Sequence, residues 1–355
     1  MERFGNSGRV VVVGGTGNIG TSVVAALERD PDVAEIRTLS RREPGPGGVK
    51  TTWTRTDVVT DDLTERFRGA DAVIHLAWIF QPTHDPVATW RTNVLGSQRV
   101  LDAVAEADVP VLVCSSSVAA YSPGPSGRSV DEDWPTDGWP NAAYSREKAY
   151  VERCLDLLEH DRTDISVLRV RNAFSFKRES ASQQRRLFLG PLFPNRAARP
   201  ERLPVVPKLP GLRFQAVHSD DVGEAYRLAA GSGRRGAFNI AGEPVVDSAV
   251  LAEMFGARVV GLPAAPVRAA LAAAWRLHLV PASPDLFDAL LRLPIMRTTR
   301  ARAELGWVPQ WSATSAIEEF VAGLRGIEGA QTAPLRPHVP GGRAHEVSTG
   351  VGQRE

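Results

Sequence analysis

Two residues, Tyr144 and Lys148, are spaced so that they could carry out proton chemistry together. Residues four apart on a helix lie on the same face, so their side chains are neighbours. A tyrosine, whose ordinary pKa is about 10, is a poor base at neutral pH, and a nearby ammonium favours the phenolate and lowers that pKa. We therefore expect Lys148 to lower the pKa of Tyr144, so that the pair can exchange a proton with an alcohol or a carbonyl.

Lysine is rare in this chain, which makes its positions informative. The 42 basic residues include four lysines, which are Lys50, Lys148, Lys177 and Lys208. A run of serines, residues 115–117, closes an apolar segment upstream of the pair. Ligands of α/β sheets bind at the carboxyl ends of strands, so a serine hydroxyl there could hydrogen-bond a reacting oxygen. Capping of the strand end is the alternative role for these hydroxyls.

A glycine turn follows the first apolar run of the chain. The segment VVVVGGTGNIG places Gly14, Gly17 and Gly20 between a predicted strand and a predicted helix. Glycines there allow a tight turn, a close approach of the backbone to a pyrophosphate, and close packing of the helix on the strand. The helix N-terminus then offers N–H groups and a positive dipole to the phosphates. This context predicts a dinucleotide site that includes Asn18 and Ile19, and an ordinary strand-to-helix turn is the alternative.

The residues at the end of the second predicted strand should determine whether the protein prefers NAD or NADP. An acidic residue there binds the ribose 2′-hydroxyl of NAD, whereas a basic residue accepts the 2′-phosphate of NADP. The sequence at residues 38–42 reads Thr-Leu-Ser-Arg-Arg, without an acid. Arg41 and Arg42 therefore favour NADP(H) as the cofactor. NAD(H) stays open, because both arginines could be solvated loop residues.

Strand and helix patterns alternate through the first half of the chain. Apolar, β-branched runs predict strands at residues 9–13, 35–39, 52–57, 72–77, 109–115 and 165–170. The spacing of apolar residues predicts helices at 21–29, 86–107 and 144–159, and a later strand and helix at 214–217 and 220–230. Such alternation forms parallel sheets with right-handed crossovers. We predict an α/β fold with a doubly wound parallel sheet of the Rossmann type.

The second half of the chain differs in composition and predicts a smaller second lobe. We assign residues 1–172 and about 212–242 to a dinucleotide-binding domain. Residues from about 173–211 and 243–325 are assigned to an interleaved C-terminal substrate lobe. The last stretch, residues 326–355, is polar and dotted with Gly and Pro, and we expect a disordered tail there.

Composition argues against several classes of function. The formal net charge of +1 and the lack of a known nucleic-acid-binding motif argue against a nucleic-acid partner. No apolar run is long enough to span a membrane, since the nearest, residues 264–281, contains arginines and a histidine. The seven histidines are not spaced like metal ligands, so we expect no metal site. The sequence also lacks the G-x-S-x-G motif of Ser-His-Asp hydrolases, which argues against that class of enzyme. Two cysteines and no export signal fit a reducing compartment, and we expect a cytoplasmic protein.

Taken in order, these motifs resemble the extended short-chain dehydrogenase/reductases, also called the NAD-dependent epimerase/dehydratase family. The resemblance runs from about Val10 to Leu324. In the first half it rests on GGTGNIG, Asp57-Val58, His75-Leu76-Ala77, Asn93-Val94 with Gly96, CSSSVAAYSPG and PNAAYSREK. In the second half LRVRNAFS, AVHSDDV, FNIAG and ELGWVP follow in family order, near Arg169, Asp221, Asn239 and Trp307.

The resemblance implies a set of site residues. Ser117, Tyr144 and Lys148 would be catalytic, with Ser117 orienting the reacting oxygen and Lys148 also holding the nicotinamide ribose. The implied cofactor contacts are Gly14, Gly17, Asn18, Ile19, Gly20, Arg41, Arg42, Asp57, Val58, Leu76, Ala77, Tyr144 and Lys148. A homodimer formed by two helices of each subunit is ordinary for the family.

Departures from the family pattern argue against a nucleotide-sugar substrate. Val118-Ala119 stand where sugar-nucleotide 4,6-dehydratases carry an Asp-Glu pair, and residues 286–293 lack the Arg-x-Gly-Asp run of epimerases. The basic residues that could bind a diphosphate are Arg169, Arg171, Lys177, Arg178, Arg185 and Arg186. The residues that would suit an apolar or aromatic substrate are Trp78, Ile79, Phe80, Phe174 and Phe176.

The sequence leaves three hypotheses for the function. The leading one is an NAD(P)-dependent oxidoreductase that moves hydride between nicotinamide and a small carbonyl or alcohol substrate through Ser117, Tyr144 and Lys148. A sugar-nucleotide epimerase that retains its NAD would use the same residues. The third is a dinucleotide-sensing regulator without catalysis, and the presence of all three residues argues against it.

Overall fold

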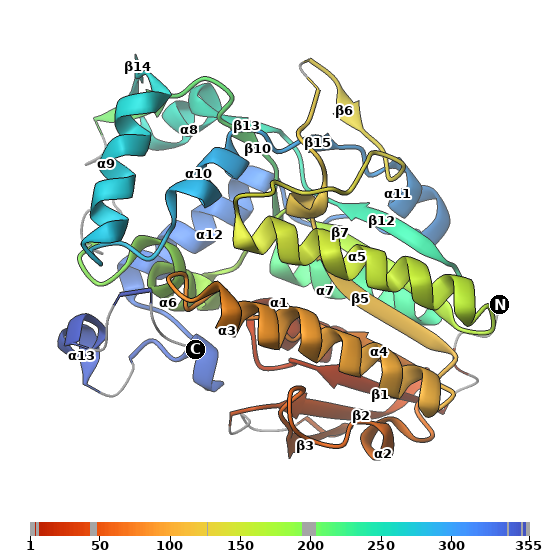
Figure 1. The fold of residues 1–355 in the computed structure, drawn as a ribbon. Helices are drawn as coiled ribbons and strands as arrows, with labels where there is room; N and C mark the ends of the chain where they lie inside the picture. Colours follow the sequence, from red (N-terminus) through yellow and green to blue (C-terminus); the bar gives the residue numbers. More distant parts are fainter. Residues whose placement is uncertain are drawn as a thin grey trace.

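The core of the protein is a seven-stranded parallel sheet (Figure 1). The computed structural model describes residues 4, 7–42, 48–125, 127–193, 204–338, 341–348 and 351–352. In sheet order the strands are β12 (Gly236–Ile240), β7 (Ser166–Asn172), β5 (Val111–Ser117), β4 (Ala72–His75), β1 (Gly8–Val13), β2 (Val33–Ser40) and β3 (Thr51–Arg55). Every neighbouring pair is parallel. The predicted doubly wound fold of the Rossmann type is thus confirmed.

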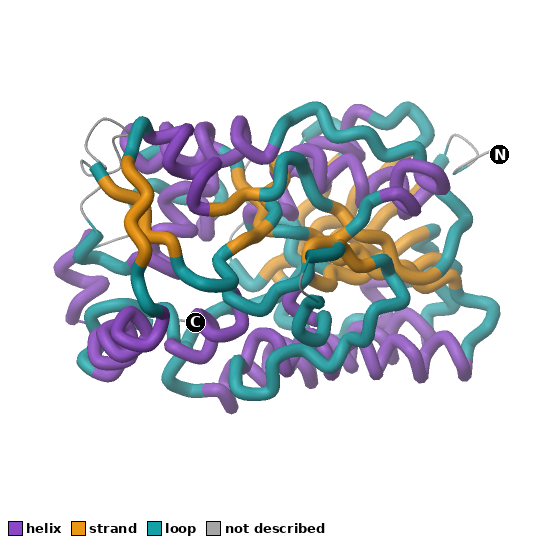
Figure 2. Tube along the Cα trace, turned by 90° about the horizontal axis from the view of Figure 1, so that it is seen from above, coloured by secondary structure: helices purple, strands orange, loops and turns teal. Residues whose placement is uncertain are grey.

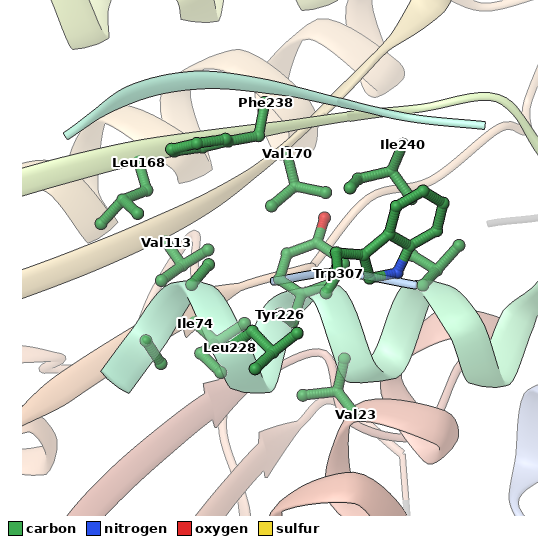
Figure 3. Packing of buried hydrophobic residues seen from close by; sticks show 14 of the residues in the cluster. Val23, Ile74, Val113, Leu168, Val170, Tyr226, Leu228, Phe238, Ile240 and Trp307 are labelled. Carbon is green, nitrogen blue, oxygen red and sulfur yellow. The ribbon is translucent and has the colours of Figure 1, made fainter. Parts of the chain in front are cut away.

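Helices cover both faces of this sheet (Figure 2), and its central strand β1 carries four consecutive buried valines. One face packs against α1 (Asn18–Arg29) and α7 (Ser219–Gly231). The other packs against α2 (Thr64–Phe67), α4 (Gly96–Glu106) and α5 (Ala143–Asp161). Figure 3 shows Tyr226 of α7 and Trp307 packed against side chains of the sheet, and both are fully buried.

The helix predicted at 86–107 is divided into three parts. It begins as α3 (Pro86–Trp90), loosens into a π-helical turn (Arg91–Leu95), and continues as α4. Asp85 caps its start by accepting from the N–H groups of Val87 and Ala88, each at 3.1 Å. The π-turn presents Asn93, which is fully buried.

Short strands and helices make up the second lobe, at one end of the sheet (Figure 1). Its strands are β8 (Phe174–Phe176), β9 (Val205–Lys208), β10 (Arg213–Phe214), β11 (Ala216–His218), β13 (Val246–Asp247) and β14 (Arg258–Gly261). Its helices are α6 (Ala181–Gln184), followed by a π-turn (Arg185–Leu189), α8 (Ser248–Phe255), α9 (Ala264–Arg276), α10 (Pro284–Leu290) and α12 (Ala313–Gly326). The remaining elements are the pair β6 (Ser129–Val130) and β15 (Ile295–Met296), and α11 (Thr299–Leu305).

The prediction of one strand at 214–217 in the main domain is wrong. The chain forms β10, which pairs with β13, and β11, which pairs with β8, and neither joins the seven-stranded sheet. The break falls at Gln215, whose side-chain amide donates to the Met296 carbonyl at 3.1 Å and accepts from the Met296 N–H at 2.7 Å. The helix expected next is present as α7.

The prediction of a disordered tail after residue 325 is wrong for the parts that the structure describes. They include a 3-10 turn (Ala333–Leu335) and α13 (Gly342–Ser348), and Leu335 is fully buried. Polar contacts with distant segments hold this part of the chain, so it needs little apolar periodicity. Residues 339–340, 349–350 and 353–355 of the predicted tail, and 194–203 of the predicted lobe, lie outside the described residues.

Three further features bear on possible sites. Among the described residues, no helix is long and apolar enough to cross a membrane. Nor do they contain a group of three or more His, Cys, Asp and Glu side chains that could hold a metal ion. Both cysteines are free thiols, and burial raises the pKa of Cys114 to about 12, so this thiol is protonated at neutral pH.

Candidate active site

The glycine turn joins β1 to α1 and leaves little room for side chains. Gly14 has a φ of +92°, and a Cβ there would lie 2.7 Å from the Ala77 backbone nitrogen. A Cβ on Gly20 would lie 2.4 Å from the Gly14 carbonyl oxygen. Gly17 is the N-cap of α1, and no side chain at this position accepts a hydrogen bond from the first N–H groups of the helix. A compact turn with N–H groups left for an anion fits a pyrophosphate.

The other predicted cofactor residues near this turn are partly or fully buried. The side chain of Asn18 is held in place, because it donates to the Ser175 carbonyl at 2.9 Å and accepts from the Ser219 hydroxyl at 2.8 Å. Asn18 is therefore suited to offer a phosphate its backbone N–H rather than its amide. The partly buried residues are Ile19, Leu76 and Ala77, and the fully buried one is Val58.

An open hollow at the ends of β2 and β3 is lined by three arginines. It encloses about 600 Å³, and its lining residues are Arg41, Arg42, Arg55, Asp57, Thr60 and Asp61. Burial, and then the neighbouring Arg41, lower the pKa of Arg42. Arg55 ends β3 opposite Ser40 of β2. It is absent from the predicted set, although the order of strands in a Rossmann sheet would have placed it here.

Two of the predicted catalytic residues meet at the carboxyl end of β5. Ser117 is the last residue of that strand, and its hydroxyl accepts from the Ala119 N–H at 3.1 Å. Tyr144 lies in the first turn of α5, with its phenol near the Ser117 side chain. Burial raises the pKa of Tyr144 to about 12, although the Ser117 side chain acts to lower it. Tyr144 is therefore protonated at neutral pH.

Lys148, one turn further along α5, contacts the backbone of β5 and the Trp78 ring. Its ammonium donates to the Ser115 carbonyl at 2.7 Å and lies 3.5 Å from the centre of the Trp78 ring. Burial lowers the pKa of Lys148 to about 8. The expectation that Lys148 lowers the pKa of Tyr144 is wrong for this structure, because loss of contact with water outweighs any charge effect on the phenol.

An aromatic wall, consisting of Trp78, Phe80 and Phe188, lies on one side of the site, and two of its rings contact Tyr144. Phe80 stacks on Tyr144 with ring centres 4.7 Å apart and planes 15° apart, and Trp78 meets Tyr144 edge-on at 5.9 Å. Phe188 contacts Phe80 edge-on at 5.4 Å. The other two predicted aromatics lie elsewhere, since Phe174 packs on Phe214 and Phe176 on Phe320.

A buried carboxyl positions the backbone between Trp78 and Phe80. Asn93 accepts from the Ile79 N–H and donates to the Ile79 carbonyl, each at 2.8 Å. Its amide also donates to Glu147 at 2.7 Å, and Thr89 donates to the other oxygen of Glu147 at 2.6 Å. Burial raises the pKa of Glu147. No sequence pattern indicates this link, although Glu147 stands between Tyr144 and Lys148.

The six basic residues considered for a diphosphate all have partners within the chain. Arg171 makes two bonds of 2.9 Å with Glu152, which also contacts Arg169 at 3.2 Å. The other ion pairs are Arg178 with Glu319 at 2.7 Å and Arg185 with Glu346 at 2.8 Å. Lys177 donates to the hydroxyls of Thr21 and Ser22, and Arg186 donates to the carbonyls of Pro334 and Arg336. These contacts give all six a structural role.

The model of the NAD dependent epimerase/dehydratase family matches residues 10–241, which include the glycine turn and the three predicted catalytic residues. The chain belongs to this family. Members of the NAD dependent epimerase/dehydratase family are enzymes, and a nicotinamide dinucleotide is the expected cofactor.

Proteins described as dehydrogenases and as epimerases are both similar to the chain. Rv0501 of Mycobacterium tuberculosis (strain ATCC 25618 / H37Rv) is 24% identical over 339 residues, which are 93% of this chain and 86% of the relative. An L-arabinose 1-dehydrogenase (NAD(P)(+)) of Haloferax volcanii is 36% identical over 110 residues, 31% of this chain and 41% of the relative. The structure of UDP-glucose 4-epimerase from Thermus thermophilus in complex with NAD is similar in fold. It has a TM-score of 0.65 and 22% identity, and covers 90% of this chain and 99% of its own.

The later segments that resemble the family, near Asp221, Asn239 and Trp307, make hydrogen bonds that stabilise the fold. Trp307 donates its indole N–H to the Asp221 carbonyl at 2.8 Å. The Asp221 carboxylate accepts from the N–H groups of Gln310 at 2.8 Å and Trp311 at 3.0 Å. Asn239 accepts from the Tyr121 hydroxyl at 2.7 Å. These segments therefore join the lobe to the sheet and lie outside the group of residues around Tyr144.

Proposed function

We propose that this chain is an NADP(H)-dependent oxidoreductase that interconverts a carbonyl and an alcohol. The observation that carries the proposal is the meeting of Tyr144 and Ser117 at the carboxyl end of β5, beside the buried Lys148. Ligands of doubly wound sheets bind at this edge. The group needs only a hydride donor or acceptor to complete the reaction, and the cofactor supplies that chemistry when bound.

The protonation state of Tyr144 favours reduction of a carbonyl. Because burial raises its pKa to about 12, the phenol carries its proton at neutral pH and can give it to the carbonyl oxygen as the adjacent carbon gains hydride. Ser117 would orient that oxygen through its hydroxyl. The ammonium of Lys148 would stabilise the phenolate that remains, until water restores the proton.

NADP(H) is the cofactor that the hollow beside β2 and β3 supports best. Arg41, Arg42 and Arg55 line it together, and guanidinium groups bind phosphate with paired hydrogen bonds. Asp57 and Asp61 share the hollow and oppose part of this charge. The balance still favours a 2′-phosphate, because the residue after β2 is an arginine where an acid would bind the ribose of NAD.

The substrate side supports an uncharged carbonyl compound with an apolar or aromatic body. Trp78 and Phe80 contact the Tyr144 ring, and Phe188 extends this wall through its contact with Phe80. The basic residues considered for a diphosphate are committed to partners within the chain. A nucleotide sugar that bound through these residues would have to displace their partners, which makes the epimerase the less favoured alternative.

The test is a substrate screen of the purified protein with NADPH and NADH. The panel contains aromatic and aliphatic ketones and aldehydes, and UDP-sugars as the matched alternative. We expect NADPH oxidation with apolar or aromatic carbonyls. Interconversion of a UDP-sugar with retained dinucleotide and no net redox would instead establish the epimerase.

A further inference from the structure

The chain beyond α12 contacts the glycine turn. Thr332 donates its hydroxyl to the backbone carbonyl of Thr16 at 2.8 Å. Thr16 lies within the turn, between Gly15 and Gly17. Both ends of this bond are shielded from water, since Thr16 is 6% and Thr332 7% exposed. A residue more than three hundred positions away therefore contacts the turn that is predicted to hold the pyrophosphate.

Thr332 is presented by a closed loop rather than by a loose end. The Ala330 N–H donates to the Leu335 carbonyl at 3.0 Å, and the Leu335 N–H donates to the Thr332 carbonyl at 2.9 Å. Leu335 itself is fully buried. These bonds fix the Thr332 hydroxyl in one place, so its contact with the turn costs little additional ordering.

A second contact fastens this segment to the lobe. Arg186 donates to the carbonyls of Pro334 at 2.7 Å and Arg336 at 3.0 Å. Its neighbour Arg185 makes two bonds with Glu346, at 2.8 and 3.1 Å, and both side chains are buried. These arginines belong to the π-turn that carries Phe188 of the aromatic wall. Figure 1 draws this end of the chain beside α6.

A third contact reaches the loop after β4. The Thr83 N–H donates to the Gly352 carbonyl at 2.7 Å. This loop carries Trp78 and Phe80, which flank Tyr144. The described part of the C-terminal segment, residues 328–338, 341–348 and 351–352, therefore contacts both the cofactor side and the substrate side of the site. We call it the C-terminal strap.

We propose that the C-terminal strap is a wall of the dinucleotide site that slows release of the cofactor, with Thr332 as its positioning residue. Thr332 uses a carbonyl of the turn and does not cap the N–H groups at the start of α1, so strap and cofactor can be bound together. Exit of the dinucleotide then requires this contact to open first. The inference rests on the proposed function only in requiring a dinucleotide at the glycine turn.

The test is the rate at which NADPH leaves the full-length protein, measured by stopped-flow fluorescence with an excess of competing nucleotide. Thr332→Val keeps the shape of the side chain and removes its donor, and we expect release to become roughly five-fold faster. Thr332→Val combined with Glu346→Gln should release NADPH faster still. Thr163→Val, on an exposed residue remote from the site, is the matched control and should release at the unaltered rate.

A second measurement follows from the reciprocity of linked binding. If the strap holds the cofactor, NADPH must slow hydrogen exchange at the Ala330 and Leu335 amides in the unaltered protein. Faster release from the variants together with this protection supports the strap. Unchanged release from folded Thr332→Val and from the double variant, or tighter NADPH binding in either, overturns it.

The outcomes separate this inference from the proposed function. Binding of a dinucleotide with strap-independent release overturns the strap and leaves the oxidoreductase standing. Failure of the full-length protein to bind either NADPH or NADH overturns both.

Discussion

Lys148 donates its ammonium to the backbone carbonyl of Ser115 at 2.7 Å, two residues before the end of β5. The bond ties α5 to the strand that carries Ser117, and Trp78 covers the ammonium from the other side. The cation is therefore held at the end of this strand, in a place shielded from water. Its influence on Tyr144 becomes important when the phenol gives up its proton.

This arrangement predicts that the activity declines with pH near the pKa of Lys148, giving a descending limb in the pH profile. Burial lowers that pKa to about 8, so the ammonium is present below this pH and is lost above it. We expect kcat/KM for carbonyl reduction to fall as the pH rises through about 8, because the phenolate then lacks its counter-charge. Lys148→Arg keeps its charge throughout this range and should lack the limb even if its activity is low. A limb at the same pH in this variant would assign the titration to another group.

The aromatic wall predicts a selective effect on substrate binding. Phe80→Ala removes the ring that stacks on Tyr144, and we expect KM for an aromatic ketone to rise roughly ten-fold. Phe174→Ala removes a ring that packs on Phe214 in the lobe, so it tests loss of packing away from the site. Equal KM values for Phe80→Ala and the unaltered enzyme would show that the aromatic wall does not bind the substrate.

The link from Glu147 through Asn93 to Ile79 predicts a coupled loss of stability and of substrate binding. Glu147→Gln replaces a carboxylate that accepts two hydrogen bonds with an amide that can accept at only one end. We expect the free energy of unfolding, measured in urea, to fall by about 2 kcal/mol, and KM to rise as Trp78 and Phe80 lose their support. Glu318→Gln, on an exposed residue of α12, is the control. Stability and KM both equal to those of the control would show that the link supports nothing.

The arginines of the hollow predict which nucleotide should bind more weakly when one of them is replaced. Arg42→Ala and Arg55→Ala should each raise the Kd for NADPH roughly ten-fold and leave the Kd for NADH nearly unchanged, since only NADPH carries the 2′-phosphate. Calorimetric titration measures both constants. Equal losses for the two nucleotides would mean that the arginines bind a part of the cofactor that both share.

Local sequence was sufficient to predict the glycine turn and the helix that carries Tyr144 and Lys148. Gly14 acts through its own backbone and its contact with Ala77, and the helical spacing of Tyr144 and Lys148 is read directly from the chain. Their environment could not be read in this way. The raised pKa of Tyr144 depends on burial, and the Lys148 ammonium is turned toward Ser115 by a backbone carbonyl that carries no sequence signal.

Contacts over long distances in the chain account for most of the remaining differences. The strap contains few apolar residues and is held by Thr16, Arg185 and Arg186, so its composition resembled that of a disordered tail. The strand expected at 214–217 was broken by Gln215 bonding to Met296. Neither partner could be identified without the fold.

The central claim is that Tyr144 gives the proton in carbonyl reduction, and Tyr144→Phe tests it most directly. The measurement is single-turnover NADPH oxidation with the best carbonyl substrate of the screen, alongside the Kd for NADPH. We predict that turnover falls by a factor on the order of 100 to 10,000 while the Kd stays nearly the same. Turnover within about two-fold of the unaltered enzyme, far from the loss expected for a missing proton donor, would contradict the account.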